Sequence, residues 1–229
     1  MTVPAEKAGV RSWWRSARSF TLAELIADGI VHGLGITLAL GLGTVLIVFA
    51  AMGFARPELP AIVVYVTSLV VLLAVSMIFN LAPISTFKRF MARLDQAAIF
   101  LLIAGTYTPF LAIMGGSSTA TLMMIAVWAA ALIGVALKLF VPEHFGRLAL
   151  VLYLGIGWSG VIIFQGLAEL LPPVSLWLLL AGGLTYSAGI VFHLWERMKF
   201  HNVVWHIFVV AGASCHLWAI FYALVLSRI

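Results

Sequence analysis

Charged side chains are scarce in this chain of 229 residues. Only 9% of the residues are Asp, Glu, Lys or Arg, whereas 64% are hydrophobic, and the mean hydropathy is +1.16. A water-soluble globular protein needs far more polar surface than this composition offers. The composition therefore excludes a soluble globule and predicts a protein that faces lipid.

Cysteine is also almost absent. The single Cys215 excludes an internal disulfide framework and a CxxC redox or zinc motif. The chain further lacks evenly spaced ten-residue segments of alternating hydrophobicity, which are the pattern of an outer-membrane barrel. These absences favour helices as the membrane-spanning elements.

Seven long apolar runs are present instead. Each has roughly the 20 residues that a helix needs to cross a hydrocarbon core about 30 Å thick. The expected spans are 29–52, 60–81, 96–115, 119–139, 148–168, 174–195 and 203–226. Because the connections between them are short, we expect residues 21–229 to form one all-α bundle of seven transmembrane helices, preceded by a basic amphipathic segment over residues 1–20.

Positive charge is concentrated at every second connection between these spans. Of the 13 Lys and Arg residues, all but Arg56 and Arg228 lie before the first span or beside every second connection. Cytoplasmic loops retain Lys and Arg, so we expect a cytoplasmic N-terminus and an extracytoplasmic C-terminus. A cytoplasmic rim that faces anionic lipid explains the net charge of +5. We therefore expect membrane lipids as partners and no nucleic acid.

Polar side chains at membrane depth are the main functional signal, because ionisable groups there are costly and usually functional. With the orientation above, four helices carry such groups near their cytoplasmic ends, several of them four residues apart and hence on one helical face. They are Glu24, Asp28, His32, Ser76, Asn80, Asp95, Gln96, Asn202 and His206. We expect these side chains to line one cytoplasmic-side polar cavity.

Each group also has a purely structural explanation. Thr21 and Glu24 match a capping box. Asp28 and Asp95 lie near helix N-termini, where the helix dipole favours negative charge, and His32 alone fits a hydrogen-bonded core histidine. The convergence of four helices on one level favours a functional site over these separate explanations.

His216 does not belong to the same level. It lies ten residues beyond His206, which is about 15 Å along a helix. We therefore expect it to be a hydrogen-bonding group near the bilayer midplane and not a ligand of the same ion.

Two segments carry a family resemblance. The run LDQAAIFLLIAGTYTPF from Leu94 to Phe110 resembles the signature of the hemolysin III family, the bacterial branch of the progestin and adipoQ receptor group. The run NVVWHIFVVAG from Asn202, with Cys215 and His216 after it, is similar to the last-helix motif of that family. Earlier blocks of the family are matched by Glu24 with His32-Gly33 and by Ser76 with Phe79-Asn80.

The resemblance implies seven helices in a bacterial inner membrane, a cytoplasmic N-terminus and a zinc site. In the adiponectin receptors, which look like distant relatives, three histidines hold zinc near the cytoplasmic leaflet, beside a serine and an aspartate, and alkaline ceramidases are similar. The ligand positions fall here on Asn80, Asn202 and His206, and the serine and aspartate fall on Ser76 and Asp95.

Only one of these three ligand positions is a histidine in this chain. Asparagine offers a neutral carbonyl oxygen, which suits hard cations better than zinc. We therefore expect a degenerate zinc site, with zinc as a possible but weakly held cofactor.

Two functions follow from these expectations. The first is a sensor or regulator in membrane-lipid homeostasis that uses the cytoplasmic-side polar cavity. The second is a ceramidase-like intramembrane lipid hydrolase, in which Asp95, Ser76 and His206 act with a recruited metal or as acid and base. A channel or cytolysin is a further alternative, which the name of the family alone suggests.

Overall fold

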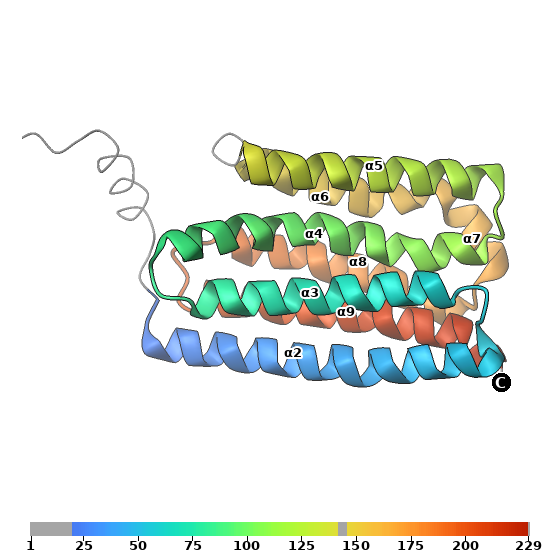
Figure 1. Ribbon diagram of the computed structural model, residues 1–229, viewed down its shortest axis with the longest axis horizontal. Coiled ribbons are helices and arrows are strands. Elements are labelled where there is room, and N and C mark those ends of the chain that lie inside the picture. The colour runs from blue at the N-terminus through green and yellow to red at the C-terminus, as the bar shows by residue number, and fades with distance from the viewer. Residues whose placement is uncertain (1–19, 142–145, 229) are drawn as a thin grey trace, which may run out of the picture.

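The computed structural model describes residues 20–141 and 146–228, so nearly all of the predicted basic segment 1–20 lies outside the described residues. The described residues form helices and short connections, without a strand (Figure 1). In chain order the helices are α2 (Leu22–Phe49), the π-helical η1 (Ala50–Phe54), α3 (Leu59–Leu81), α4 (Thr86–Ile113), α5 (Ser118–Phe140), α6 (Gly146–Trp158), the 3-10 helix η3 (Ser159–Ile163), α7 (Phe164–Leu170), α8 (Pro173–Leu194), α9 (His201–Leu224) and the 3-10 helix η4 (Leu226–Arg228).

Seven helical segments within the described ranges are long and apolar enough to cross a membrane, which confirms the predicted all-α bundle of seven spans. The first span begins at Leu22 and the third at Thr86, several residues before the predicted starts. Capping explains both differences, since Thr21 accepts a hydrogen bond from the Glu24 amide and Ser85 accepts one from the Lys88 amide. Polar first turns are thus helical although hydropathy alone does not mark them.

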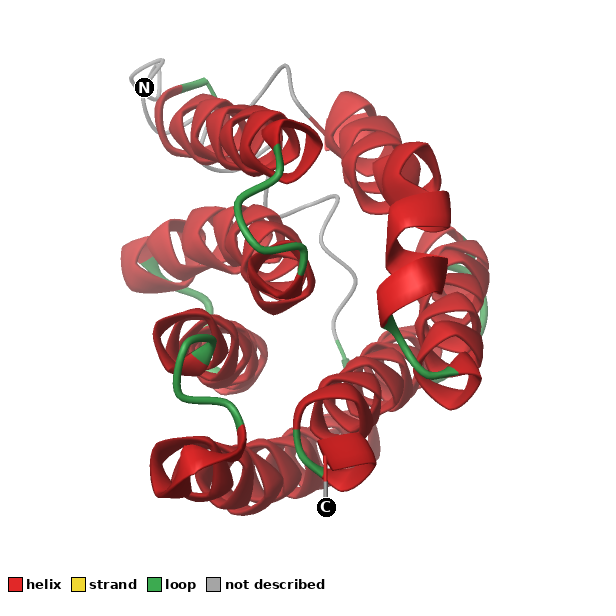
Figure 2. Ribbon diagram, turned by 90° about the vertical axis from the view of Figure 1, so that its right-hand side faces the viewer, coloured by secondary structure: helices red, strands yellow, loops and turns green. Residues whose placement is uncertain are grey.

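The helices are arranged in a ring (Figure 2). Helix α2 contacts α3 on one side and α9 on the other, α3 packs along α4, and α8 packs along α9. Figure 1 places the start of α2, the α3–α4 connection and the α8–α9 connection at one end of the bundle. We call it the basic end, because Lys88, Arg89, Arg197 and Lys199 belong to it. That this end is cytoplasmic stays a prediction.

Two glycines allow α2 to approach its neighbours closely. A Cβ atom at Gly35 would lie 2.8 Å from Val210 Cγ2 on α9, and one at Gly43 would lie 2.6 Å from Val66 Cγ1 on α3. Small residues let helix backbones pack closely in membranes. Gly35 thus lets the middle of α2 pack closely on α9, and Gly43 lets its second half pack closely on α3.

The predicted span 148–168 is not one regular helix. Helix α6 changes to the 3-10 helix η3 at Ser159 before α7 continues. The hydroxyl of Tyr107 on α4 lies 3.0 Å from the carbonyl oxygen of Ile156 and 2.9 Å from that of Gly157. A side chain that competes for helix carbonyls is a known cause of such interruptions, and the hydrophobic pattern alone does not reveal it.

Candidate functional site

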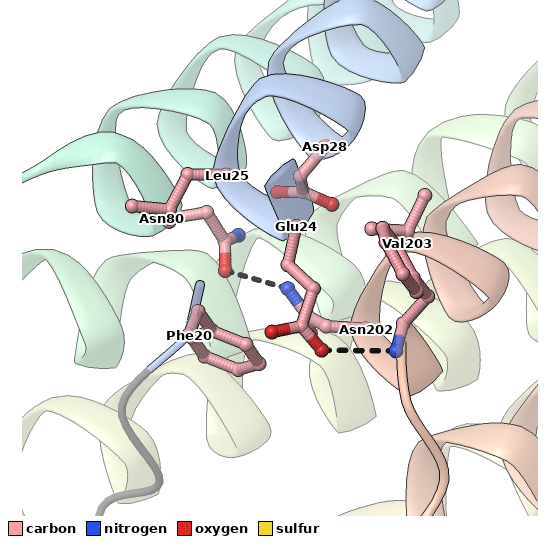
Figure 3. A pocket seen from close by; sticks show the side chains of 8 residues that line it. Phe20, Glu24, Leu25, Asp28, Asn80, Asn202 and Val203 are labelled. Carbon is pink, nitrogen blue, oxygen red and sulfur yellow. Dashed lines mark hydrogen bonds between the residues drawn. The ribbon is translucent and has the colours of Figure 1, made fainter. Parts of the chain in front are cut away.

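Glu24 joins the first turns of α2 and α9. Its Oε2 accepts hydrogen bonds from the amide (2.8 Å) and the hydroxyl (2.9 Å) of Thr21, which confirms the predicted capping box. Its Oε1 accepts a hydrogen bond of 2.9 Å from the amide of Phe200 (Figure 3). Phe200 has a positive φ of 58°, so one carboxylate both caps α2 and holds the tight turn that leads into α9.

The two asparagines at ligand positions implied by the resemblance bind each other. Nδ2 of Asn202 donates to Oδ1 of Asn80 at 2.9 Å (Figure 3). Nδ2 of Asn80 in turn donates to the carbonyl oxygen of Ser76 at 2.9 Å and lies 3.3 Å from its hydroxyl. The amide groups are therefore used in contacts between α3 and α9.

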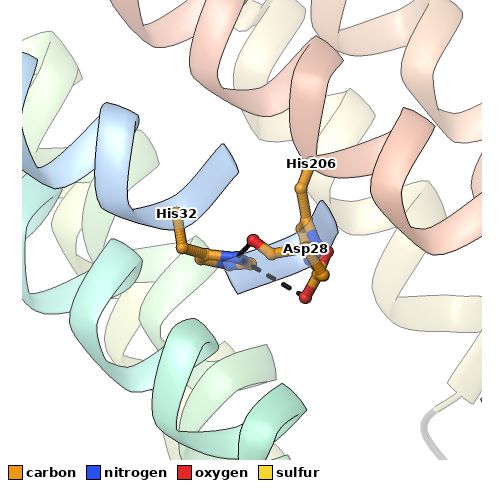
Figure 4. Close-up of side chains that lie close together, drawn as sticks. All are labelled: Asp28, His32 and His206. Carbon is orange, nitrogen blue, oxygen red and sulfur yellow. Dashed lines mark hydrogen bonds and ion pairs between the residues drawn. The ribbon is translucent and has the colours of Figure 1, made fainter. Parts of the chain in front are cut away.

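His206 contacts α2 through Asp28 and His32. Its Nδ1 lies 2.6 Å from Oδ1 of Asp28, and its ring makes an edge contact with the ring of His32, with centroids 4.3 Å apart (Figure 4). Nδ1 of His32 lies 2.9 Å from the carbonyl oxygen of Asp28 and 3.5 Å from its Oδ2. All three side chains are buried, with exposed fractions of 2% for Asp28, 1% for His32 and 6% for His206.

Ser76 and Asp95 complete the polar cluster, whereas Gln96 does not join it. The hydroxyl of Ser76 lies 3.5 Å from Nε2 of His206, and Asp95 lies beside Ser76 and within electrostatic range of His206. Gln96 is exposed, and its Oε1 accepts a hydrogen bond of 2.6 Å from Lys138 on α5. We use the term polar cluster below for Asp28, His32, Ser76, Asn80, Asp95, Asn202 and His206.

An apolar cavity of about 280 Å³ lies next to the polar cluster. Leucine, isoleucine and aromatic side chains from α4, α6, α7, α8 and α9 line most of it. His216 also lines the cavity, and its Nε2 lies 3.3 Å from the carbonyl oxygen of Leu179. His216 is thus a hydrogen-bonding group away from His206, as the sequence predicted.

On α3, α4 and α9, a residue that lines the cavity lies one helical turn from a residue of the polar cluster. Its lining includes Leu72 on α3, Ile99 on α4 and Val209 on α9. Leu72 lies four residues from Ser76, Ile99 four residues from Asp95 and Val209 three residues from His206. Each separation is about one helical turn of 5.4 Å. On each helix the cavity residue lies on the side of the cluster away from the basic end, so the cavity and the cluster lie in series.

A metal ion fits part of this cluster. Asp28, His32 and His206 each offer one ligand atom, and these atoms lie within 4.8 Å of one another. Zinc therefore remains a possible cofactor. The sequence pointed to Asp28 and His32 only as cavity-lining groups, and their spacing of four residues was the signal that they share a face.

Comparisons with known proteins agree with the resemblance. Residues 20–217 match the family model described as haemolysin-III related. The chain is 33% identical over 204 residues to the hemolysin-3 homolog of Bacillus subtilis, covering 89% of this chain and 95% of that protein. It is also 33% identical over 202 residues to hemolysin-3 of Bacillus cereus, covering 88% and 92%. The human monocyte to macrophage differentiation factor is 26% identical over 163 residues, covering 69% and 67%.

Proposed function

The chain belongs to the haemolysin-III-related family, and we propose that it is a multi-pass protein of the bacterial inner membrane that senses or regulates membrane-lipid state. In this proposal one membrane lipid places an acyl chain in the apolar cavity and its polar end at the polar cluster. The serial arrangement of cavity and cluster on α3, α4 and α9 is the observation that carries the proposal.

The polar end of the lipid supplies the selectivity. An acyl chain that leaves the bilayer for an apolar cavity exchanges one apolar environment for another, so its transfer contributes little free energy. A carboxylate, amide or ester at the inner end of the cavity would instead meet Ser76 and His206, which are 5% and 6% exposed. Hydrogen bonds made in such a dry place discriminate between head groups.

Filling the cavity tests this proposal. Leu176 on α8 lines the cavity, and Leu176→Trp reduces its volume. Leu184 lies on the same helix but is 54% exposed, so Leu184→Trp is the matched control. We expect a photoreactive fatty acid in vesicles to crosslink to the wild type and to Leu184→Trp, and at least about tenfold less to Leu176→Trp. Equal crosslinking of all three would contradict the proposal.

A lipid hydrolase is the second candidate, and one contact favours it. The Ser76 hydroxyl faces Nε2 of His206 at 3.5 Å, while Asp28 holds Nδ1 of the same ring. A hydroxyl, a base and a carboxylate that orients the base form the arrangement used in acyl transfer.

Release of fatty acid from ester and amide lipids in vesicles distinguishes the two functions. A hydrolase would lose activity in Ser76→Ala and keep it in Ser68→Ala, because the hydroxyl of Ser68 donates to the Tyr65 carbonyl oxygen outside the polar cluster. A protein that binds lipid but releases no fatty acid would be a sensor or regulator.

A further inference from the structure

We propose that Asp28, His32 and His206 form a site for a divalent transition metal, displaced from the ligand set that the family resemblance implies. The displaced site uses α2 and α9, whereas the implied set of Asn80, Asn202 and His206 uses α3 and α9. This inference goes beyond the proposed function, because lipid binding in the cavity needs no metal.

The implied ligand set does not fit zinc. Oδ1 of Asn80 already accepts the Asn202 amide at 2.9 Å, and Nδ2 of Asn80 points to Ser76. Amide groups that satisfy each other offer no negative charge and no imidazole nitrogen, which are the donors that zinc prefers. Of that set, His206 alone retains a nitrogen ligand, and its Nδ1 lies against Asp28 on α2.

One carboxylate oxygen of Asp28 lacks a hydrogen-bond partner at the displaced site. Its Oδ1 lies 2.6 Å from His206 Nδ1, but its Oδ2 is fully buried and makes no hydrogen bond. Nδ1 of His32 lies 3.5 Å from this oxygen, beyond normal hydrogen-bond length. A buried carboxylate at membrane depth is costly unless a cation or donors compensate it, and a divalent metal would supply that charge.

His32 is oriented to act as a ligand. The backbone carbonyl oxygen of Asp28 can only accept, so Nδ1 of His32 carries the hydrogen of their 2.9 Å bond. The lone pair of neutral His32 therefore lies on Nε2, where it can bind a metal, and the carbonyl fixes the ring. The ring of His206 lies 4.3 Å away between centroids, within reach of one shared ion.

The donor set selects the class of metal. Two imidazole nitrogens and one carboxylate suit zinc and similar first-row ions, with water or a lipid oxygen as a further ligand. Calcium and magnesium prefer oxygen ligands alone. Cobalt(II) is a suitable spectroscopic probe, because it accepts the same donors as zinc.

Cobalt titration of the full chain in detergent tests the site. After removal of metals with a chelator, we expect about one cobalt per chain with visible d–d absorption, and competition by zinc. His32→Ala should weaken cobalt binding by at least about 100-fold, because loss of a ligand costs more than the 10–100-fold loss caused by removing a group that only orients one. Asn80→Ala with Asn202→Ala should weaken cobalt binding far less than His32→Ala does, because neither asparagine is a ligand of the displaced site. Thr37→Ala, whose exposed hydroxyl bonds only to its own helix outside the polar cluster, should bind cobalt as the wild type does.

A second variant covers the case in which His32→Ala does not fold. In a Cys215→Ala background, His32→Cys should still bind cobalt and add a thiolate-to-metal absorption band, which arises only if residue 32 is a ligand. The inference would be overturned if Asn80→Ala with Asn202→Ala lost cobalt binding while His32→Ala kept it in full. That result would place the metal at the ligand set that the resemblance implies. A folded wild type without cobalt absorption would also overturn it, and crosslinking of the fatty acid in the same preparation would show that the proposed function survives.

Discussion

Asp28→Ala should destabilise the bundle, because Asp28 connects α2 to α9 through His206. The substitution removes the carboxylate oxygen 2.6 Å from Nδ1 of His206, and that ring is only 6% exposed. A buried donor left without a partner costs about 1–3 kcal/mol, and single hydrogen bonds between membrane helices contribute up to about 1.7 kcal/mol. We therefore expect a loss of about 2 kcal/mol, or roughly 30-fold in the unfolding equilibrium.

The assay is reversible unfolding in mixed micelles, followed by circular dichroism with a chelator present so that no metal contributes. Asp28→Asn keeps an acceptor of similar size and should lose less than about half as much, because a neutral acceptor is roughly half as strong. Thr37→Ala is the control, since its hydroxyl bonds to its own helix at Gly33 and is exposed. An Asp28→Ala protein within about 0.5 kcal/mol of wild type, or an Asn variant as unstable as the Ala variant, would refute the reasoning.

Three further predictions address packing, the turn before α9 and topology. Gly35→Ala should cost about 1–3 kcal/mol, because its Cβ would lie 2.8 Å from a side chain on α9, whereas Gly41→Ala meets nothing within 4 Å and should be neutral in the same assay. Glu24→Ala should speed amide hydrogen exchange in the first turn of α9. Glu24→Gln keeps one acceptor oxygen, so its amides in that turn should exchange more slowly than those of Glu24→Ala. Equal rates in wild type and Glu24→Ala would show that the capping carboxylate does not hold that turn. In a Cys215→Ala background, a membrane-impermeant thiol reagent should label Arg56→Cys and not Arg89→Cys in intact cells, and the opposite pattern would reverse the predicted orientation.

The sequence was sufficient for the helices and for the level of the polar groups, but not for the pairing within that level. Spacing placed Asn202 and His206 on one face of α9. The contact of His206 with α2 requires α2 to pack closely on α9, and Gly35 allows that approach. A family ligand set transferred by position assumes that these helices keep the same distances, and hydropathy carries no information about them.

The position of Gln96 on α4 explains why it does not join the polar cluster. Adjacent residues on a helix are rotated by about 100°, so Gln96 cannot share the direction of Asp95. It contacts Lys138 on α5 instead. The interruption at Ser159 involves the hydroxyl of Tyr107 from another helix, a contact that hydropathy does not reveal.

The surroundings of the polar cluster favour a ligand that enters from the membrane. Toward the basic end, Glu24 ties α2 to the turn before α9, and the cavity there is only about 10 Å³, room for about one water. On the opposite side the apolar cavity of about 280 Å³ begins one turn away. A water-soluble ligand would have to break the Glu24 contacts to reach His206, whereas in the proposed function the acyl chain of a lipid would approach the cluster through the apolar cavity. The Glu24 contacts would also block the basic end for a metal held by Asp28, His32 and His206, which leaves the apolar cavity as its exit. A fatty acid in the cavity should therefore slow the removal of cobalt by a chelator.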